Sequence, residues 1–142
     1  MLFTGQRRSD ITRLGRQHVN GKTIRFTQFK GRKRKPKAME LPILPILQQA
    51  IDETQCGELN FLVNDLGRPF TDANFGDWFH DRCVEAGVPC RAHGLCKAGA
   101  TIAAENGATE HQLMAIFGWT SLAMAEKYTA RSRERLAGAV IS

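Results

Sequence analysis

The sequence lacks the features that would place the chain in a membrane or outside the cell. No apolar run approaches the ~20 residues that a membrane-spanning helix needs, and residues 1–10 (MLFTGQRRSD) have no apolar core of a secretion signal. The four cysteines form no regular framework of the kind that small secreted domains use. We therefore expect a cytoplasmic protein with reduced thiols and no membrane association.

The chain is also too short for several sizeable domains. Its 142 residues, of which 42% are hydrophobic, are sufficient for one hydrophobic core. No internal repeat, low-complexity tract or linker divides the sequence. Residues 1–142 are therefore expected to form a single domain.

Charge is distributed unevenly along the chain. Residues 1–37 carry 12 Lys or Arg residues against one acid, whereas residues 38–142 carry 8 against 13 acids. The two parts have formal charges of +11 and −5. Such a concentration of bases is typical of a surface that binds a polyanion, most commonly nucleic acid. A solvated basic hairpin is the alternative that charge alone leaves open.

Apolar residues recur at every second position in two segments, residues 22–29 and 38–43, and this period predicts a β-hairpin. The apolar positions are Ile24, Phe26, Met39 and Leu41. The connection KGRKRKPK, residues 30–37, contains six bases in eight positions. It is too polar to pack, so we expect it to project from the body.

Helical periodicity and capping residues predict a mainly helical second part. The expected ranges are residues 46–55, 72–86, 93–106, 110–117 and 122–130. Thr71 is expected to cap the second helix, and Thr109 with Gln112 forms a capping box before the fourth. Residues 131–142 are a candidate for a further helix. The predicted fold class is mainly α with a small antiparallel β-hairpin or sheet.

Two strings in the basic part of the chain resemble motifs of the tyrosine recombinase, or phage integrase, family. TGQRRSD (residues 4–10) is similar to the family's Thr-Gly-x-Arg-x-x-Glu box, which implies that Arg7 holds the scissile phosphate. A guanidinium suits this role because it donates two parallel charge-assisted hydrogen bonds to phosphate oxygens. FKGRKRKPK (residues 29–37) resembles the hairpin loop that delivers a lysine to the leaving 5′ oxygen. This implies Lys30 as the general acid, with Lys33 as the alternative.

The remaining bases of this loop are assigned to DNA contacts on the same resemblance. They are Arg32, Lys33, Arg34, Lys35 and Lys37.

Two later strings resemble the family's motifs in the same order. HGLCKAGAT (residues 93–101) is similar to its His-x-x-Arg box, which implies His93 as an acid–base residue. The spacing predicts that residues 93 and 96 share one face of the first helical turn and converge on one phosphate. The expected second arginine, however, is Cys96.

FGWTS and AEKYTA resemble the family's Leu-Gly-His/Trp segment and its nucleophile helix. The resemblance implies Trp119 as a hydrogen-bond donor and Tyr128, the only tyrosine, as the nucleophile. Taken singly, Trp119 would be interpreted as a core anchor and Tyr128 as a half-buried helix residue. The order of the four strings favours the functional interpretation.

The resemblance implies the catalytic-domain fold of a tyrosine recombinase, which cleaves and rejoins double-stranded DNA through a 3′-phosphotyrosyl intermediate. It implies no metal or other cofactor, because the covalent link conserves the bond energy. It also implies a homotetramer on DNA, assembled through the segment from Arg131 to Ser142, with a monomer expected in the absence of DNA.

Family catalytic domains begin some helices before the first arginine box and follow a separate DNA-clamping domain, whereas here the box begins at Thr4. We therefore expect an N-terminally truncated catalytic domain without the clamping domain. Its DNA binding should be weak and strongly dependent on salt.

Cys96 carries neither a fixed charge nor a bidentate donor. Loss of one preorganised donor to an anionic transition state costs roughly 10²–10³ in rate, so we expect severely impaired strand cleavage, and a Cys96→Arg variant that captures more DNA. A catalytically impaired DNA-binding remnant is therefore the first alternative. A zinc-stabilised interaction module is the second, with candidate ligands His80, Cys83, Cys90, His93 and Cys96.

Overall fold

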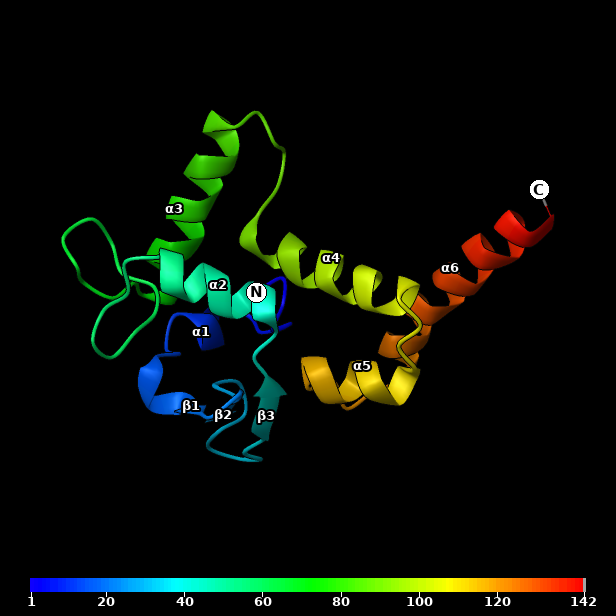
Figure 1. Cartoon of the computed structure of the whole chain (residues 1–142), viewed down its shortest axis with the longest axis horizontal. Coiled ribbons are helices and arrows are strands. Elements are labelled where there is room, and N and C mark those ends of the chain that lie inside the picture. Colours follow the sequence, from blue (N-terminus) through cyan, green and yellow to red (C-terminus); the bar gives the residue numbers. More distant parts are fainter. Residues whose placement is uncertain (142) are drawn as a thin grey trace.

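The computed structural model of the chain describes residues 1–141 and confirms a mainly helical fold with one small antiparallel sheet (Figure 1). The helices are α1 (Arg8–Ile11), the 3-10 turn η1 (Arg16–His18), α2 (Pro45–Glu53), α3 (Asp72–Glu85), α4 (Ala92–Glu105), α5 (Glu110–Phe117) and α6 (Leu122–Ile141). The strands are β1 (Val19–Asn20), β2 (Thr23–Thr27) and β3 (Ala38–Pro42).

The sheet has the order β1-β2-β3, and the expected hairpin is formed by β2 and β3. Ile24 pairs with Leu41 and Phe26 with Met39, so the alternating apolar residues share one face. Ile24, Met39 and Leu41 are buried. The short strand β1 pairs antiparallel with β2 and was not expected, because two residues give no period to detect.

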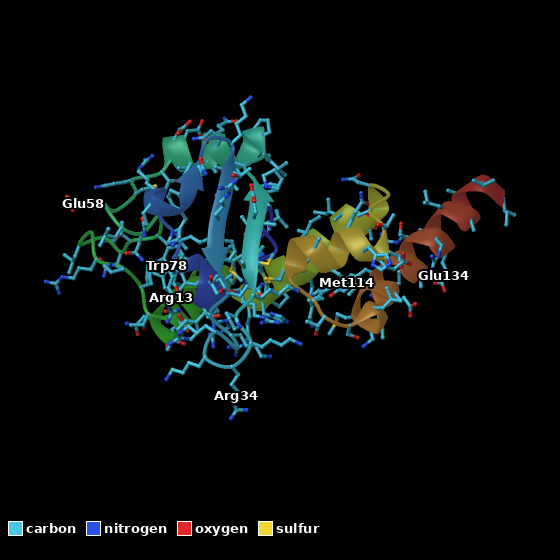
Figure 2. The ribbon with its side chains drawn as sticks, turned by 90° about the horizontal axis from the view of Figure 1, so that it is seen from below. Arg13, Arg34, Glu58, Trp78, Met114 and Glu134 are labelled. Carbon is cyan, nitrogen blue, oxygen red and sulfur yellow. The ribbon has the colours of Figure 1, made fainter. Side chains whose placement is uncertain are left out.

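The basic connection projects from the end of this hairpin, as predicted. Figure 2 shows Arg34 at its tip, pointing away from the rest of the molecule. Residues 30–36 are exposed. The chain therefore presents its densest group of bases on a protruding turn.

The helix ends follow from local capping chemistry. The Thr71 hydroxyl accepts a hydrogen bond from the Asn74 amide at 3.2 Å and begins α3. Thr109 and Gln112 form the expected reciprocal pair at the start of α5. At the end of α5, Gly118 adopts φ +71°, a conformation that glycine accommodates without strain.

Two groups of buried residues hold the elements together. One includes Leu14, Ile24, Ile51 and Phe75, which are buried and line a common apolar cavity. The other joins α4, α5 and α6 and consists of Ala100, Ala104, Leu113, Phe117 and Ala125. The small alanine side chains let α4, α5 and α6 approach one another closely in this second group.

The last helix is longer than expected. Residues 122–130 and the tail form one continuous helix, α6, which leaves the body and carries the C-terminal end away from it (Figure 1). Leu136 is 57% exposed, and Val140 and Ile141 are each 86% exposed. Within residues 1–141, none of the helices is both long and apolar enough to cross a membrane.

Candidate functional site

The first arginine string forms a tightly packed turn that leads into α1. Gly5 has φ +66°, and a Cβ atom added there would lie 2.5 Å from Phe117 Cδ1, so only glycine fits. Gln6 is 1% exposed. Arg7 follows as the N-cap residue of α1, with an extended backbone and a half-buried side chain. The packing of residues 5 and 6 therefore fixes the place from which Arg7 projects.

Arg7 borders two adjoining hollows in the surface. The first, which we call the arginine hollow, is lined by Arg7, Arg8, Asp72, Asp77, Arg91 and His93. The second, the hairpin hollow, is lined by Arg7, Ser9, Phe29, Lys30, Arg32 and Lys33 among others. Their volumes are about 680 and 550 Å³, within the range of ligand-binding clefts. The structure therefore brings Arg7 together with His93 on one side and Lys30 on the other.

The base of the hairpin turn is fixed by Phe29, directly before Lys30. The Phe29 amide donates a hydrogen bond to Asp10 Oδ1 at 2.7 Å. Its ring lies between two guanidinium groups, with Arg13 Cζ 3.6 Å and Arg32 Cζ 3.5 Å from the ring centroid. These contacts hold Lys30 at the edge of the hairpin hollow, although the Lys30 side chain itself is exposed.

A buried amide network joins three segments that are far apart in the sequence. Gln28 Nε2 donates to Gln6 Oε1 at 2.9 Å and to the Phe117 carbonyl at 3.4 Å. Gln6 Nε2 donates to the carbonyl oxygens of Thr4 and Ile116, at 2.9 and 3.0 Å. The network therefore ties together the segment that carries Arg7, the strand that leads to Lys30, and the turn that carries Trp119.

Trp119 and Tyr128 lie together in a stack of aromatic rings. The Trp119 ring centroid is 4.8 Å from that of Phe117 and 5.3 Å from that of Tyr128, with interplanar angles of 22° and 18°. Both residues are half-buried and pack against the second core group. Tyr128 also lines a hollow between α4 and α6, together with Thr101 and Arg131. The tyrosine therefore lies beside Trp119 but borders a different hollow from those that Arg7 lines.

Cys96 lies behind the site and not at its surface. It is 7% exposed, and its thiol donates a hydrogen bond to the Gln6 carbonyl at 3.2 Å. Burial raises the pKa of the Cys96 thiol above its usual value, which favours the neutral form. His93, by contrast, is exposed at the arginine hollow. The expected convergence of residues 93 and 96 on one phosphate is therefore not observed with cysteine at position 96.

The polar atoms of the candidate site are available to a ligand. Within residues 1–141, no hydrogen bond or ion pair engages the side chains of Arg7, Lys30, His93, Trp119 and Tyr128, although the Trp119 backbone carbonyl accepts from Lys37. By comparison, exposed arginines such as Arg13 and Arg25 pair with carboxylates at 2.7 and 3.0 Å.

The bases assigned to DNA contacts occupy two different environments. Arg32, Lys33, Arg34 and Lys35 are exposed on the protruding turn. Lys37 is half-buried, and its ammonium donates to the Trp119 carbonyl at 3.4 Å. Lys37 therefore connects the hairpin to the Trp119 turn, in addition to the contact that the amide network makes.

The zinc interpretation has no support in the part of the chain that the structure describes. Residues 1–141 contain no group of three or more His, Cys, Asp or Glu side chains placed to hold a metal ion. The five candidate ligands are spread over two helices and the connection between them, and Cys96 is used in the contact with Gln6.

Sequence inspection missed the residues that assemble the site. Gln6 and Gln28 form the amide network, and Asp10 and Phe29 hold the hairpin. The period of two that identified Ile24 and Phe26 continues to Gln28, so a buried polar residue was detectable on that face. Its partners lie 22 and 89 positions away along the chain, and no local pattern indicates them.

A model of a protein family, described as the phage integrase family, matches residues 1–135 of the chain. No curated protein matches the sequence of this chain.

Solved structures with the same fold include that of the XerA recombinase, with 18% identity and a TM-score of 0.75, covering 95% of this chain and 53% of that one. The Tn1549 transposon integrase in complex with circular intermediate DNA has 17% identity and a TM-score of 0.73, and the match covers 95% of this chain and 57% of that one. A lambda integrase dimer bound to a COC′ core site has 16% sequence identity with this chain and a TM-score of 0.74, and the match covers 90% of this chain and 48% of that one. The chain thus spans about half the length of these structures.

Proposed function

Because the chain belongs to the phage integrase family, whose model matches residues 1–135, we propose that it is a catalytic domain that cleaves and rejoins double-stranded DNA through a covalent bond to Tyr128. The Tyr128 oxygen attacks a phosphodiester phosphorus, and the bond from phosphorus to the 5′ oxygen breaks. The products are a 3′-phosphotyrosyl link and a free 5′ hydroxyl. Attack on this link by a 5′ hydroxyl of a partner strand completes the exchange without a metal or cofactor.

The candidate side chains have distinct roles in this reaction. Arg7 binds the phosphate oxygens and stabilises the charge that develops on them. His93 accepts the phenol proton, and Lys30 donates a proton to the leaving 5′ oxygen. Trp119 holds the Tyr128 ring by stacking before DNA binds, and its indole N–H is free to donate to the phosphate.

The observation that carries this proposal is the place of Arg7 between His93 and Lys30. These three cationic or proton-transferring groups come from residues 7, 30 and 93, and they border adjoining hollows. The amide network adds the Trp119 turn to the same assembly. A phosphate bound by Arg7 would therefore have an acid on one side and a base on the other.

Tyr128 has to leave its stack on Trp119 for this reaction to occur. The ring borders the hollow between α4 and α6, and its hydroxyl is held by no hydrogen bond from residues 1–141. An aromatic stack of this kind contributes about 0.5–1.5 kcal/mol beyond area burial. The release of the ring is therefore a small cost that DNA binding can meet, and we propose that it accompanies binding.

We propose further that the exposed bases Arg32, Lys33, Arg34 and Lys35 contact the DNA backbone near the cleaved bond. Arg32, Lys33 and Arg34 line the hairpin hollow together with Lys30 and Arg7, so the same duplex segment can reach the protruding turn and the candidate site. The solved structures of the Tn1549 transposon integrase and of lambda integrase are complexes with DNA. Contacts of this type add affinity that falls steeply with salt concentration.

Assembly into a tetramer on DNA is proposed through α6. From Arg133 to Ile141 the helix is exposed, and Leu136, Val140 and Ile141 present apolar side chains to solvent. An apolar surface on a projecting helix suits docking against another copy of the chain. Ser142, the last residue of the predicted assembly segment, lies outside the described residues.

A second function, DNA binding without cleavage, is favoured by one observation. Position 96 is buried against the Gln6 carbonyl and provides no cation. If no other group replaces the missing second arginine, the scissile phosphate contacts one guanidinium fewer than the family's motif provides. The chain would then bind DNA through its hairpin and fail to cut it.

The two functions are distinguished by covalent capture of nicked duplexes of randomised sequence. Religation fails when the short fragment beyond the nick dissociates, so a phosphotyrosyl adduct accumulates and resists denaturing detergent. We expect an adduct with the native chain and none with Tyr128→Phe, which keeps the ring and removes the oxygen. Salt-dependent binding without an adduct would instead support the second function.

Individual roles are tested on the same substrates. A bridging sulfur in place of the 5′ oxygen leaves without needing a proton, so it should rescue Lys30→Ala and leave Arg7→Ala inactive. Lys22→Ala and His111→Gln are matched controls, because they remove an exposed lysine and an exposed histidine outside the two hollows. Failure of the sulfur substrate to rescue Lys30→Ala would refute the acid role of Lys30.

A further inference from the structure

The absence of an arginine at position 96 leaves the proposed site with an unfilled role. Arg7 can donate a bidentate pair of hydrogen bonds to one edge of a phosphate, and Cys96 is committed to the Gln6 carbonyl. A second guanidinium would have to come from elsewhere in the chain and reach the same phosphate. The following inference rests on the proposed function.

Arg91 lines the arginine hollow together with Arg7 and His93. It is the N-cap residue of α4 and has an extended backbone, φ −127° and ψ 162°, two positions before His93. Its side chain is exposed and makes no capping hydrogen bond. Within residues 1–141 no carboxylate forms an ion pair with it, so the guanidinium is available to an anion.

The charges around this hollow favour a single bound phosphate. Arg7, Arg8 and Arg91 contribute three positive charges, and Asp72 and Asp77 contribute two negative ones. Asp72 already accepts a hydrogen bond from Arg13 at 2.7 Å in an ion pair, which offsets its charge. The remaining excess is positive, and a phosphodiester carries one negative charge. The free amides at the start of α4 add to this preference.

The other arginines near the site are less well placed. Arg8 is packed against α3, since a Cβ added at Gly76 would collide with the Arg8 guanidinium. Arg131 borders the hollow that contains Tyr128, between α4 and α6. Arg91 is therefore the arginine that shares a hollow with both Arg7 and His93 and has no competing contact with α3.

We propose that Arg91 supplies the second guanidinium to the scissile phosphate, in place of an arginine at position 96. The role moves from the first turn of α4 to its N-cap residue, and the phosphate is held between Arg7 and Arg91 with His93 beside it. The chain would on this account retain strand cleavage despite Cys96.

The test compares single-turnover rates of adduct formation on nicked duplexes of randomised sequence for four proteins. These are the native chain, Arg91→Ala, Cys96→Arg, and the double variant. We expect Arg91→Ala to slow capture by roughly 10²–10³-fold, as for loss of one donor to an anionic transition state. Cys96→Arg should accelerate capture far more in the Arg91→Ala background than in the native one, because the two arginines fill one role. Arg68→Ala, which removes an exposed arginine from the loop between Val63 and Pro69, should have no effect.

A second measurement does not depend on cleavage or on tolerance of arginine at the buried position 96. The slope of log binding constant against log salt for a duplex of random sequence should become less negative by about 0.9 in Arg91→Ala, as for one lost phosphate contact. The slope should be unchanged in Arg68→Ala.

The outcomes separate this inference from the function on which it rests. An Arg91→Ala protein that captures DNA within twofold of the native rate would overturn the role of Arg91 and leave Tyr128 chemistry intact. An unchanged salt slope in Arg91→Ala would also overturn it. If the native chain forms no adduct, strand cleavage is refuted. If the salt slope of binding nevertheless becomes less negative by about 0.9 in Arg91→Ala, Arg91 is retained as a phosphate contact.

Discussion

The buried amide network should make Gln28 one of the most sensitive polar positions in the chain. Gln28 is 6% exposed and Gln6 1% exposed, and the 2.9 Å hydrogen bond between them joins the hairpin to the segment before Arg7. Gln28→Met removes the donor while nearly preserving the shape of the side chain. The change therefore tests the hydrogen bonds with little contribution from a cavity.

The expected loss of stability in Gln28→Met follows from the polar atoms that the substitution leaves without a donor. Gln6 Oε1 would remain buried without a donor, and the Phe117 carbonyl would lose its 3.4 Å contact. A buried acceptor left unsatisfied costs about 1–3 kcal/mol, and the more apolar methionine offsets part of that. We expect the free energy of unfolding to fall by about 1–3 kcal/mol, and adduct formation to slow because Arg7, Lys30 and Trp119 lose a common support.

Urea unfolding followed by circular dichroism measures this change, with a double-mutant cycle between Gln6→Met and Gln28→Met. The double variant should cost less than the sum of the single variants, because it removes both partners of the bond. Gln55→Met, at an exposed position, should stay within about 0.5 kcal/mol of the native value. Additive costs, or a Gln28→Met protein as stable as the native one, would refute the reasoning.

Three further predictions concern charge and protonation. Neutralising Lys33, Arg34 and Lys35 to Gln should reduce the salt slope of duplex binding by up to about 0.9 per lost contact, whereas Lys22→Gln should not change it. Burial raises the pKa of Asp10 above its usual value, with the Phe29 amide and nearby arginines opposing the shift. Because the folded form then binds the proton more tightly, stability should decline as the pH rises from the usual carboxylate pKa through the raised one. Asp10→Asn should flatten that part of the profile, and an unchanged profile would exclude Asp10 as its source. Burial also raises the pKa of the Cys83 and Cys96 thiols. Iodoacetamide at pH 8 should therefore modify the half-exposed Cys56 and Cys90 first, and the reverse order by mass spectrometry would contradict the buried positions.

Local patterns were sufficient to predict most of the elements. The alternation of Ile24 and Phe26 with polar residues identified the hairpin, and its partner residues Met39 and Leu41 are in the observed register. Thr71 and the Thr109–Gln112 box marked the starts of two helices because capping is a contact between residues that are close in sequence. The continuity of α6 was not predicted, because the polar run RSRER, residues 131–135, separates the apolar positions of residues 122–130 from those of the candidate helix that follows.

The assembly of the site depended on contacts that local patterns do not contain. Gln6 donates to a carbonyl 110 positions away, and Cys96 donates to the carbonyl of Gln6, 90 positions earlier. An arginine at position 96 would be expected to face a phosphate. The small neutral thiol of Cys96 instead packs inward. The sequence does not single out Arg91, because it belongs to none of the four strings and its place beside Arg7 and His93 depends on the fold.

The covalent role of Tyr128 is tested most directly by identifying the residue that retains DNA. After incubation with nicked duplexes, nuclease digestion and proteolysis, mass spectrometry should find a nucleotide on the Tyr128 peptide, and none on the same peptide from Tyr128→Phe. A nucleotide attached to any other residue, or an adduct that persists in Tyr128→Phe, would contradict the account.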